Sequence, residues 1–326
     1  MAIPTTEFTS DALLRSVRRK AFMPINDETF SDDDILEMAT EELRAYCVPL
    51  LKSINEEYLV RYYDYTTATM SNNRVYALPE RCTGEVLKDV QYSDSSGSFM
   101  PMTRVEPENS FRFDVGAGSS GGSSCYYLQD DNIVLNAAPN FATLRIRYFM
   151  RPSKLVKLEL STVVASYTAL TRLIGVTLDL TTPFYTHLVA VPSWKLDIIR
   201  PRPGFRSTTI DLTTSYVTGT APLVVYTGTV PTGDPIPAVN DIICLAGESC
   251  FPQIPVDMHP LLAQRTAMRM LEGKNSAGYA LLAQELVASE GRLRGMLENR
   301  VEGGSRFIHN YQSAAWKSAR STRRIR

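Results

Sequence analysis

The sequence has no run of eighteen consecutive apolar residues, the minimum length for a helix that spans a membrane. Its first residues show no basic segment leading into an apolar stretch, so no signal peptide is visible. The 326 residues are 44% hydrophobic and 21% charged, a composition typical of a folded protein with about two domains. We therefore expect no membrane contact.

Cysteine and histidine are also scarce, and their spacing suggests no metal site. The five cysteines form no CxxC pair, and the three histidines form no HExxH or HxxxH pattern. We expect free, buried thiols in a reducing compartment. His259 precedes Pro260 at an expected helix start and is interpreted as a surface or capping residue.

Signatures of catalysis and of cofactor binding are missing in the same way. The sequence contains no Walker A loop, no Gly-x-Ser-x-Gly elbow and no cysteine nucleophile signature. Residues 116–121 do match G-x-G-x-x-G, but a strand-like segment follows them instead of the helix that would hold a pyrophosphate. We interpret this segment as a hairpin loop, and we expect neither a cofactor nor an enzymatic activity.

The two signs of charge are unevenly distributed, although the formal net charge is only −1. Residues 300–326 hold seven basic residues against Glu302, a net charge of +6, which leaves −7 for the first 299 residues. Residues 207–264 contain no Lys or Arg. This pattern argues against a protein that grips DNA along its whole surface.

The order of the segments predicts an α+β fold in four parts. Residues 1–58 are expected to be helical, residues 59–255 to be an inserted antiparallel β region, and residues 256–300 to form an αα-hairpin. Residues 301–326 are expected to be an extended basic arm. Amphipathic helices at both ends need partners, so we expect them to pack together into one bundle.

Several residues predict where these helices begin and end. Ser31 is a good N-cap, and the three aspartates that follow it favour the positive end of a helix rather than a metal site. Pro49 should kink that helix. Asp257 is expected to cap a later helix that ends at Gly273. A short helix over residues 11–20 and a last one from about Ser276 complete the set.

The middle segments predict a sandwich or barrel of short strands separated by Gly, Ser, Asn and Pro. The expected strands include KLVKLEL (154–160) and FYTHLVAV (184–191), while TALTRLIGVTLDL (168–180) is open between strand and helix. A break near Pro152 would give two β modules, and one larger domain is equally compatible with the pattern.

The segment that follows residue 299 combines basic and aromatic side chains. Three interpretations remain open: a solvated tail, an arm that binds nucleic acid, and an arm that orders on a partner protein. We favour the third, because exposed aromatic side chains next to Arg are typical of interface anchors. The candidate docking residues are Arg300, Arg306, Phe307, Ile308, Tyr311, Trp316, Lys317, Arg320, Arg323, Arg324 and Arg326.

Two segments resemble the head-to-tail connector proteins of tailed bacteriophages. Residues 31–65, SDDDILEMATEELRAYCVPLLKSINEEYLVRYYDY, are similar to the opening helix of these proteins. Residues 301–310, VEGGSRFIHN, resemble their C-terminal arm. Connectors of this kind are often small and purely helical, so the long β region is a departure from the family.

The resemblance implies a structural virion protein of the head–tail interface, assembled in the host cytoplasm. Such adaptors form a ring, commonly of twelve subunits, beneath the portal protein. The C-terminal arm docks on the portal, and the opposite side of the ring receives tail, nozzle or tail-completion proteins. Packaged DNA passes through the ring without specific binding.

Two rival functions make different predictions. A virion or cell-surface attachment module that binds carbohydrate would assemble as a trimer and expose aromatic clusters on its loops. A hydrolase with its site in the β region would have a deep pocket lined by convergent carboxylates or histidines.

Overall fold

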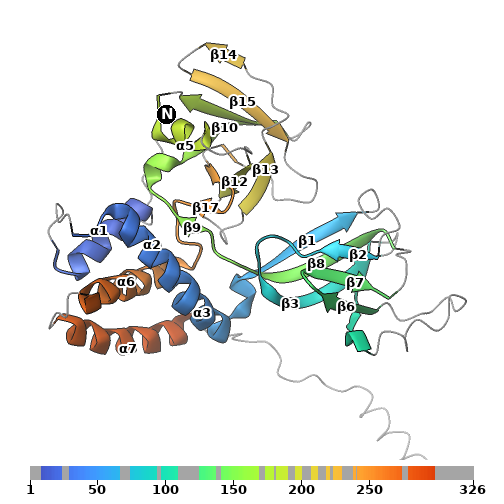
Figure 1. Cartoon of the computed structure of the whole chain (residues 1–326), viewed down its shortest axis with the longest axis horizontal. Helices are drawn as coiled ribbons and strands as arrows, with labels where there is room; N and C mark the ends of the chain where they lie inside the picture. Colours follow the sequence, from blue (N-terminus) through green and yellow to red (C-terminus); the bar gives the residue numbers. More distant parts are fainter. Residues whose placement is uncertain are drawn as a thin grey trace, which may run out of the picture.

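Helices lie at both ends of the described chain and strands fill its middle, so the protein is a mixed α+β protein with several antiparallel sheets (Figure 1). The computed structural model describes residues 9–23, 29–66, 74–93, 97–108, 125–136, 141–168, 173–179, 181–189, 195–199, 207–211, 218–220, 223–229, 238–239, 241–273 and 278–297. The expected hairpin loop over residues 116–121 lies outside them.

The N-terminal part folds into short helices that follow its capping signals. Ser31 caps α2 by accepting a hydrogen bond from the Asp34 backbone N–H, and the Asp34 carboxylate accepts one in return from the Ser31 backbone, which confirms the predicted helix start. The helical elements here are α1 (Ser10–Lys20), α2 (Asp32–Glu42), a π-helical turn (Leu43–Cys47), α3 (Val48–Ile54) and a 3-10 turn (Glu56–Tyr58).

The predicted interruption near Pro49 takes the form of that π-helical turn. The Val48 backbone N–H donates to the Leu43 carbonyl, five residues back instead of four. Proline has no N–H, and its ring would clash with the carbonyl four residues earlier in a regular helix. The wider turn therefore lies directly before Pro49, which stands in the first turn of α3.

The C-terminal part contains a helical hairpin. A 3-10 turn (Val256–Met258) leads into α6 (His259–Gly273), and α7 (Gly278–Leu297) follows. The predicted end of α6 at Gly273 is confirmed. The prediction that Asp257 caps this helix is wrong, because Asp257 lies inside the 3-10 turn and α6 begins two residues later.

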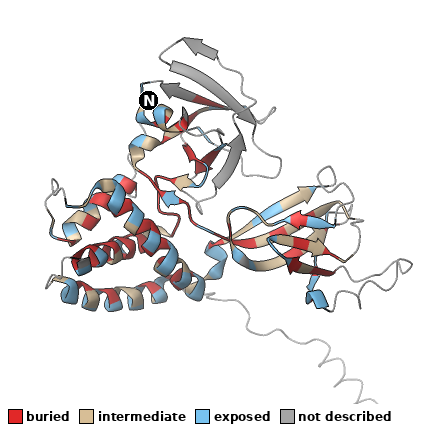
Figure 2. Ribbon diagram, viewed as in Figure 1, coloured by how far each residue is buried: buried red, intermediate tan, exposed pale blue. Residues whose placement is uncertain are grey.

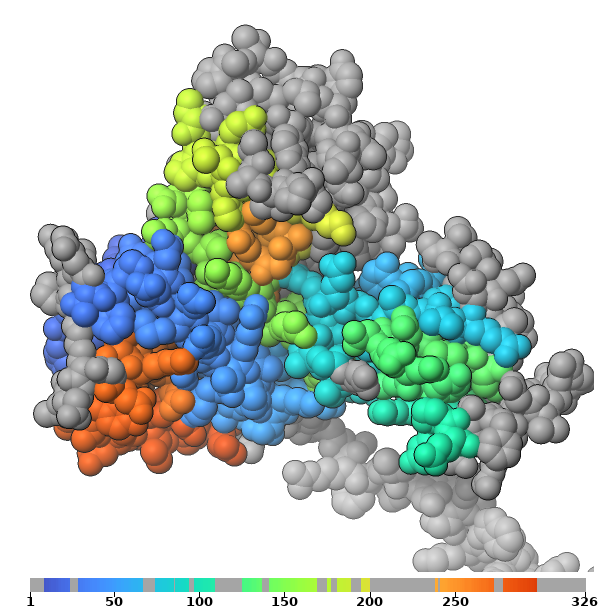
Figure 3. Space-filling model, viewed as in Figure 1, coloured from blue at the N-terminus to red at the C-terminus, as the bar shows by residue number. Residues whose placement is uncertain are grey.

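Helices from both ends of the chain share one hydrophobic core. It includes Val17 of α1, Leu36 of α2 and Leu51 of α3, together with Leu262 of α6 and Leu286 of α7. Helix α6 lies between α1 and α7 and contacts both (Figure 1). In the space-filling view the blue N-terminal and orange C-terminal helices form one continuous body (Figure 3).

A first β region follows α3. Its two four-stranded sheets have the orders β1-β8-β3-β4 and β2-β7-β6-β5, and both contribute to one buried cluster that contains Val90, Ile133 and Ile146. The strands are β1 (Val60–Thr66), β2 (Val75–Ala77), β3 (Cys82–Ser93), β4 (Phe99–Pro101), β5 (Thr103–Arg104), β6 (Cys125–Gln129), β7 (Asn132–Leu135) and β8 (Thr143–Met150).

A second β region is built on a seven-stranded antiparallel sheet with the order β13-β12-β16-β10-β11-β15-β14. Ile243 and Ile242 are neighbours in β16 but belong to different buried clusters, so this part of the sheet is covered on both faces. The strands are β10 (Thr162–Thr168), β11 (Leu173–Asp179), β12 (Lys195–Ile199), β13 (Ser207–Asp211), β14 (Thr218–Thr220), β15 (Leu223–Thr229) and β16 (Ile242–Leu245).

Two strand predictions in this region are wrong, and one open question is resolved. Residues 183–189 form α5 (Pro183–Val189), not a strand, and Phe184 and Leu188 pack one turn apart against the sheet. Residues 154–160 form only the short strand β9 (Lys154–Leu155), paired in parallel with β17 (Glu248–Ser249), and a 3-10 turn (Leu158–Leu160). The segment left open between strand and helix contains strand β11.

The three parts meet at a buried junction. Arg81, from the turn before β3, forms a 2.8 Å ion pair with Asp197 of β12, and the Asp197 side chain is fully buried. Thr40 of α2 accepts a hydrogen bond from the Leu155 backbone, and Arg44 donates to the Pro152 carbonyl. These contacts connect both β regions to each other and to the helices.

Candidate functional site

The predicted docking arm begins C-terminal to α7. All its candidate residues, from Arg300 to Arg326, lie outside the described part of the chain, since α7 ends at Leu297. The candidate surfaces within the described chain therefore consist of other residues.

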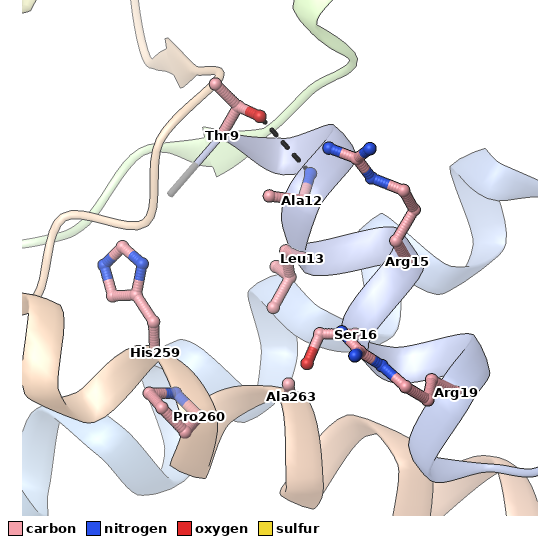
Figure 4. Close-up of a pocket in the computed structure, with 9 residues that line it drawn as sticks. All are labelled: Thr9, Ala12, Leu13, Arg15, Ser16, Arg19, His259, Pro260 and Ala263. Atoms are coloured by element: carbon pink, nitrogen blue, oxygen red, sulfur yellow. Dashed lines mark hydrogen bonds between the residues drawn. The ribbon is translucent and has the colours of Figure 1, made fainter. Parts of the chain in front are cut away.

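A pocket of about 340 Å³ lies between α1 and the start of α6. Thr9, Arg15 and Arg19 line it from the α1 side, and His259 and Pro260 line it from α6 (Figure 4). A larger groove of about 840 Å³ borders α1 as well, and Arg15 and Arg19 line this one too.

The interpretation of His259 as a surface or capping residue is wrong. Its side chain is buried, and its Nε2 lies 3.3 Å from the Ile254 carbonyl oxygen. Burial lowers its pKa to about 4, although the carbonyls of Ile254 and Pro252 partly oppose this shift. A neutral imidazole is therefore part of the packing beneath α1.

The outer face of α1 carries basic side chains. Arg18 is paired with Asp32 at 2.7 Å. Arg15 and Arg19 are exposed, stand one helical turn apart, and have neither an ion pair nor a hydrogen bond to any side chain in the described ranges. They present two unneutralised cations side by side.

Phe22 projects from the end of α1 in a strained conformation. Its φ angle is +54°, in the left-handed region that costs a bulky residue free energy and that usually contains glycine after a helix. Its side chain is 80% exposed to solvent. The fold holds a large aromatic ring in water at a position where glycine would fit better.

Helix α7 has an outer face of a different kind. Its inner face is buried through Leu282, Leu286, Leu293 and Leu297, whereas its outer face is exposed (Figure 2). Five of the exposed positions carry small or uncharged side chains and recur at helical spacing, while Glu285, Arg292 and Arg294 are exposed beside them. We name these five positions the α7 stripe: Ala280, Gln284, Val287, Ala288 and Gly291.

Apolar exposure along α7 is high. Val287 of the stripe is 71% exposed, and Leu281, elsewhere on the same helix, is 65% exposed. A Cβ atom added at Gly291 would meet nothing within 4 Å, so nothing within the described chain packs on this position. Exposed apolar side chains that cluster on one helix face are typical of an interaction surface.

Aromatic side chains also lie on the outer face of the first β region. The Arg145 guanidinium stacks between the Tyr62 ring at 4.5 Å and the Phe99 ring at 3.8 Å, and it forms a bidentate pair with Asp64. Its charge is already neutralised, so this surface is less suited than α1 to binding an anion. These aromatics stand on strands β1 and β4, not on loops.

No cluster of three or more His, Cys, Asp and Glu side chains suited to a metal ion occurs in the ranges that the structure describes. In those ranges, too, no helix is both long and apolar enough to cross a bilayer. No known family matches the chain, and no curated protein is similar to it.

Sequence reasoning missed both Phe22 and the α7 stripe. The stripe was detectable, because the positions from Ala280 to Gly291 on one helix face lack charge while the opposite face is rich in leucine. Phe22 left no comparable signal, since its importance comes from a backbone angle and an exposure that only the fold provides.

Proposed function

We propose that the protein is the head-to-tail adaptor of a tailed bacteriophage, acting by geometry and binding without a chemical step. In this proposal the helices at the two chain ends form a bundle, and the bundle forms a ring beneath the portal. The β regions project from it as inserted sandwich or barrel modules. Residues 301–326 dock on the portal protein, and tail, nozzle or tail-completion proteins bind the opposite side.

The observation that carries this proposal is the shared core of the two chain ends. Leu36 of α2 and Leu286 of α7 belong to one cluster, and α7 ends three residues before the first candidate residue of the arm. An arm that starts from a packed helix has a fixed origin, which favours docking on a neighbouring protein. The exposed outer faces of α1 and α7 supply two different surfaces, as a ring requires.

The charge distribution supports passage of DNA. Residues 207–264 contain no Lys or Arg, and each basic contact to phosphate would add salt-dependent affinity. We propose that part of this segment lies near the channel or the tail interface. The virion head–tail interface is the location that this implies, after assembly in the host cytoplasm.

One observation favours a second candidate function, that of a surface attachment module. Tyr62 and Phe99 are exposed and both contact Arg145, and exposed aromatic rings of this kind suit stacking on the apolar face of a sugar ring. The adaptor remains our conclusion, because the attachment function makes no use of the helical core.

Deletion of residues 301–326 tests the adaptor directly. Because α7 ends before the deletion, the truncated protein should keep its helical circular dichroism and lose co-purification with the portal protein of the same virus. Negative-stain images of the full chain with portal should show a ring with a central hole. Normal portal binding by the truncated chain contradicts the docking role, and a trimer without a hole favours attachment.

A further inference from the structure

The two edges of the sheet β1-β8-β3-β4 differ in how they are protected. One edge strand is β4, which has only three residues and ends at Pro101. The other is β1, which has seven residues and contains no proline, glycine or lysine (Figure 1). Short length, proline and lysine are devices that keep sheet edges from pairing with other chains. Strand β1 has none of them, and no further strand pairs with it in the described ranges.

The hydrogen-bond pattern of β1 identifies which of its backbone groups face the open side. The Met150 N–H donates to the Leu59 carbonyl at 2.9 Å, so these two residues form a hydrogen-bonded pair of the antiparallel ladder. Every second residue from Leu59 onward therefore bonds to β8, and Tyr63 is one of them. The residues between, Tyr62 and Asp64, direct their backbone N–H and C=O groups away from β8, toward the open edge.

The same pattern shows that the opposite edge is blocked. The Met102 N–H donates to the Val90 carbonyl at 2.8 Å, so these residues form a hydrogen-bonded pair of the β3–β4 ladder. Pro101 is the next residue, opposite Gln91, and its backbone faces outward. Proline has no N–H to offer at that position, which is where edge strands tolerate it. A partner strand can therefore pair with β1 but not with β4.

Strand β1 is complementary to a second copy of itself. Tyr62 and Asp64 stand on either side of Tyr63, the central residue of the strand. When two β1 strands overlap fully and run antiparallel, Tyr62 of each copy lies opposite Asp64 of the other. Both of these pairs can exchange N–H···O=C bonds, because all the groups involved face the open edge. Tyr63 of one copy then lies opposite Tyr63 of the other, in the closer, non-hydrogen-bonded kind of pair.

The side chains also fit this register. Tyr63 lies on the same side of β1 as Tyr65, which packs against the core of the first β region, and the two rings meet edge to face at 4.9 Å. Tyr63 is nevertheless 48% exposed, because no strand lies beyond it. Opposed Tyr63 rings would form an aromatic pair and lose apolar exposure. Arg61 would lie opposite Tyr65, and Val60 opposite Thr66, so no like charges are opposed.

We propose that two copies of the chain pair through their β1 strands, antiparallel and centred on Tyr63, so that the two sheets become one. The contact uses the same surface on both copies, so it closes on itself and yields a dimer. This inference goes beyond the proposed ring, whose contacts join two different surfaces, and does not depend on it. The dimer is the form expected of the free chain in the absence of portal protein.

A charge-swap experiment on the full chain tests the central position. Tyr63→Lys and Tyr63→Glu each oppose two like charges across the two-fold axis. Each variant alone should therefore lose the dimer in sedimentation velocity without portal protein. An equimolar mixture should recover it, because opposite charges then meet. Met100→Lys and Met100→Glu change an exposed position of β4, so they are matched controls and should dimerise as the wild type does.

A second test concerns the backbone and does not depend on charge. Tyr62→Pro removes an N–H that faces the open edge and leaves the bonds to β8 in place, so the variant should fold. The dimer loses this bond from each copy, and its dissociation constant should rise about thirtyfold. Tyr62→Ala keeps the N–H and is the matched control for the missing ring, so its dissociation constant should rise much less. Thermal melting of both variants verifies that they are folded.

The outcomes separate this inference from the proposed ring, which is judged by imaging with portal. A wild-type chain that stays monomeric without portal refutes the β1 contact. Association that persists in Tyr62→Pro or in each Tyr63 variant alone refutes it too, as does a failure of the folded Tyr63 variants to recover on mixing. If the wild type is monomeric and Tyr62→Pro loses binding to portal, portal occupies the β1 edge and the self-pairing is wrong.

Discussion

Helices α1 and α7 pack on opposite sides of α6, yet their outer faces differ. The outer face of α1 carries Arg15 and Arg19, which have no ion-pair partner within the described part of the chain. The outer face of α7 carries Val287 and Leu281, apolar side chains whose exposure to water is unfavourable. Both inner faces are fixed by the same need to cover α6, whereas that contact places no constraint on the outer faces.

The largest expected change in stability concerns the two faces of α7. Leu286→Ala removes a side chain buried against α6 and should lower the free energy of unfolding by about 2–5 kcal/mol. Leu281→Ala, the matched change on the outer face, should alter it by no more than about 0.5 kcal/mol. Urea unfolding followed by helical circular dichroism, at concentrations where the chain is monomeric, measures both. An equal cost for the two would mean that the outer face already packs within one chain.

The second test uses pH to distinguish the two sides of α6. The pKa of His259, beneath α1, falls from 6.5 to about 4 on folding, so the unfolded chain binds more protons between these values. Stability should therefore fall as pH drops from 7 to 4, by about 3 kcal/mol from this residue. His259→Gln should lack this contribution, and the difference between the two stability–pH curves measures it.

A matched control exists on the α7 side. The Gln264 side chain of α6 donates to the Leu282 carbonyl at 3.0 Å, and an amide does not titrate. Gln264→Leu should shift stability equally at pH 7 and pH 4. Two results would contradict the assignment of acid sensitivity to the α1 side. One is a pH-dependent change in stability for Gln264→Leu, and the other is an unchanged stability–pH curve for His259→Gln.

The smallest expected effect concerns the start of α1. The Thr9 hydroxyl accepts a hydrogen bond from the Ala12 backbone N–H at 3.3 Å and caps the helix. Thr9→Ala should lower the melting temperature through a loss of about 1 kcal/mol, because a backbone N–H loses its partner. Thr9→Ser keeps the hydroxyl and should behave like the wild type. A loss as large as that of Leu286→Ala would indicate that Thr9 does more than cap.

Local signals predicted two helix ends correctly, although the predicted cap at Asp257 was wrong. Ser31 with its aspartates, and Gly273, act through contacts a few residues away, which a sequence displays directly. Residues 183–189 show why the strand predictions did less well. Their aromatic and β-branched side chains favour a strand, but Thr182 and Pro183 form a helix start, and Phe184 and Leu188 lie on one helix face.

The interaction surfaces were harder to predict than the fold. Burial of His259 depends on α1 packing over a segment some 250 residues away in sequence, and the exposure of Phe22 depends on the turn that follows its helix. The Arg81–Asp197 ion pair joins two β regions through side chains that resemble ordinary surface charges in sequence. Such contacts are consequences of tertiary packing.

The shared core of the two chain ends also sets the order of events during synthesis. Leu59 and Ile254 belong to one cluster, yet roughly 200 residues separate them, which a ribosome adds in roughly 10 to 40 s. Both β regions consist of contiguous chain and can fold within that interval, because they need no residue made later than their own last strand. The N-terminal helices keep an apolar face uncovered until α6 emerges, so the beginning of the nascent chain waits longest for its full core.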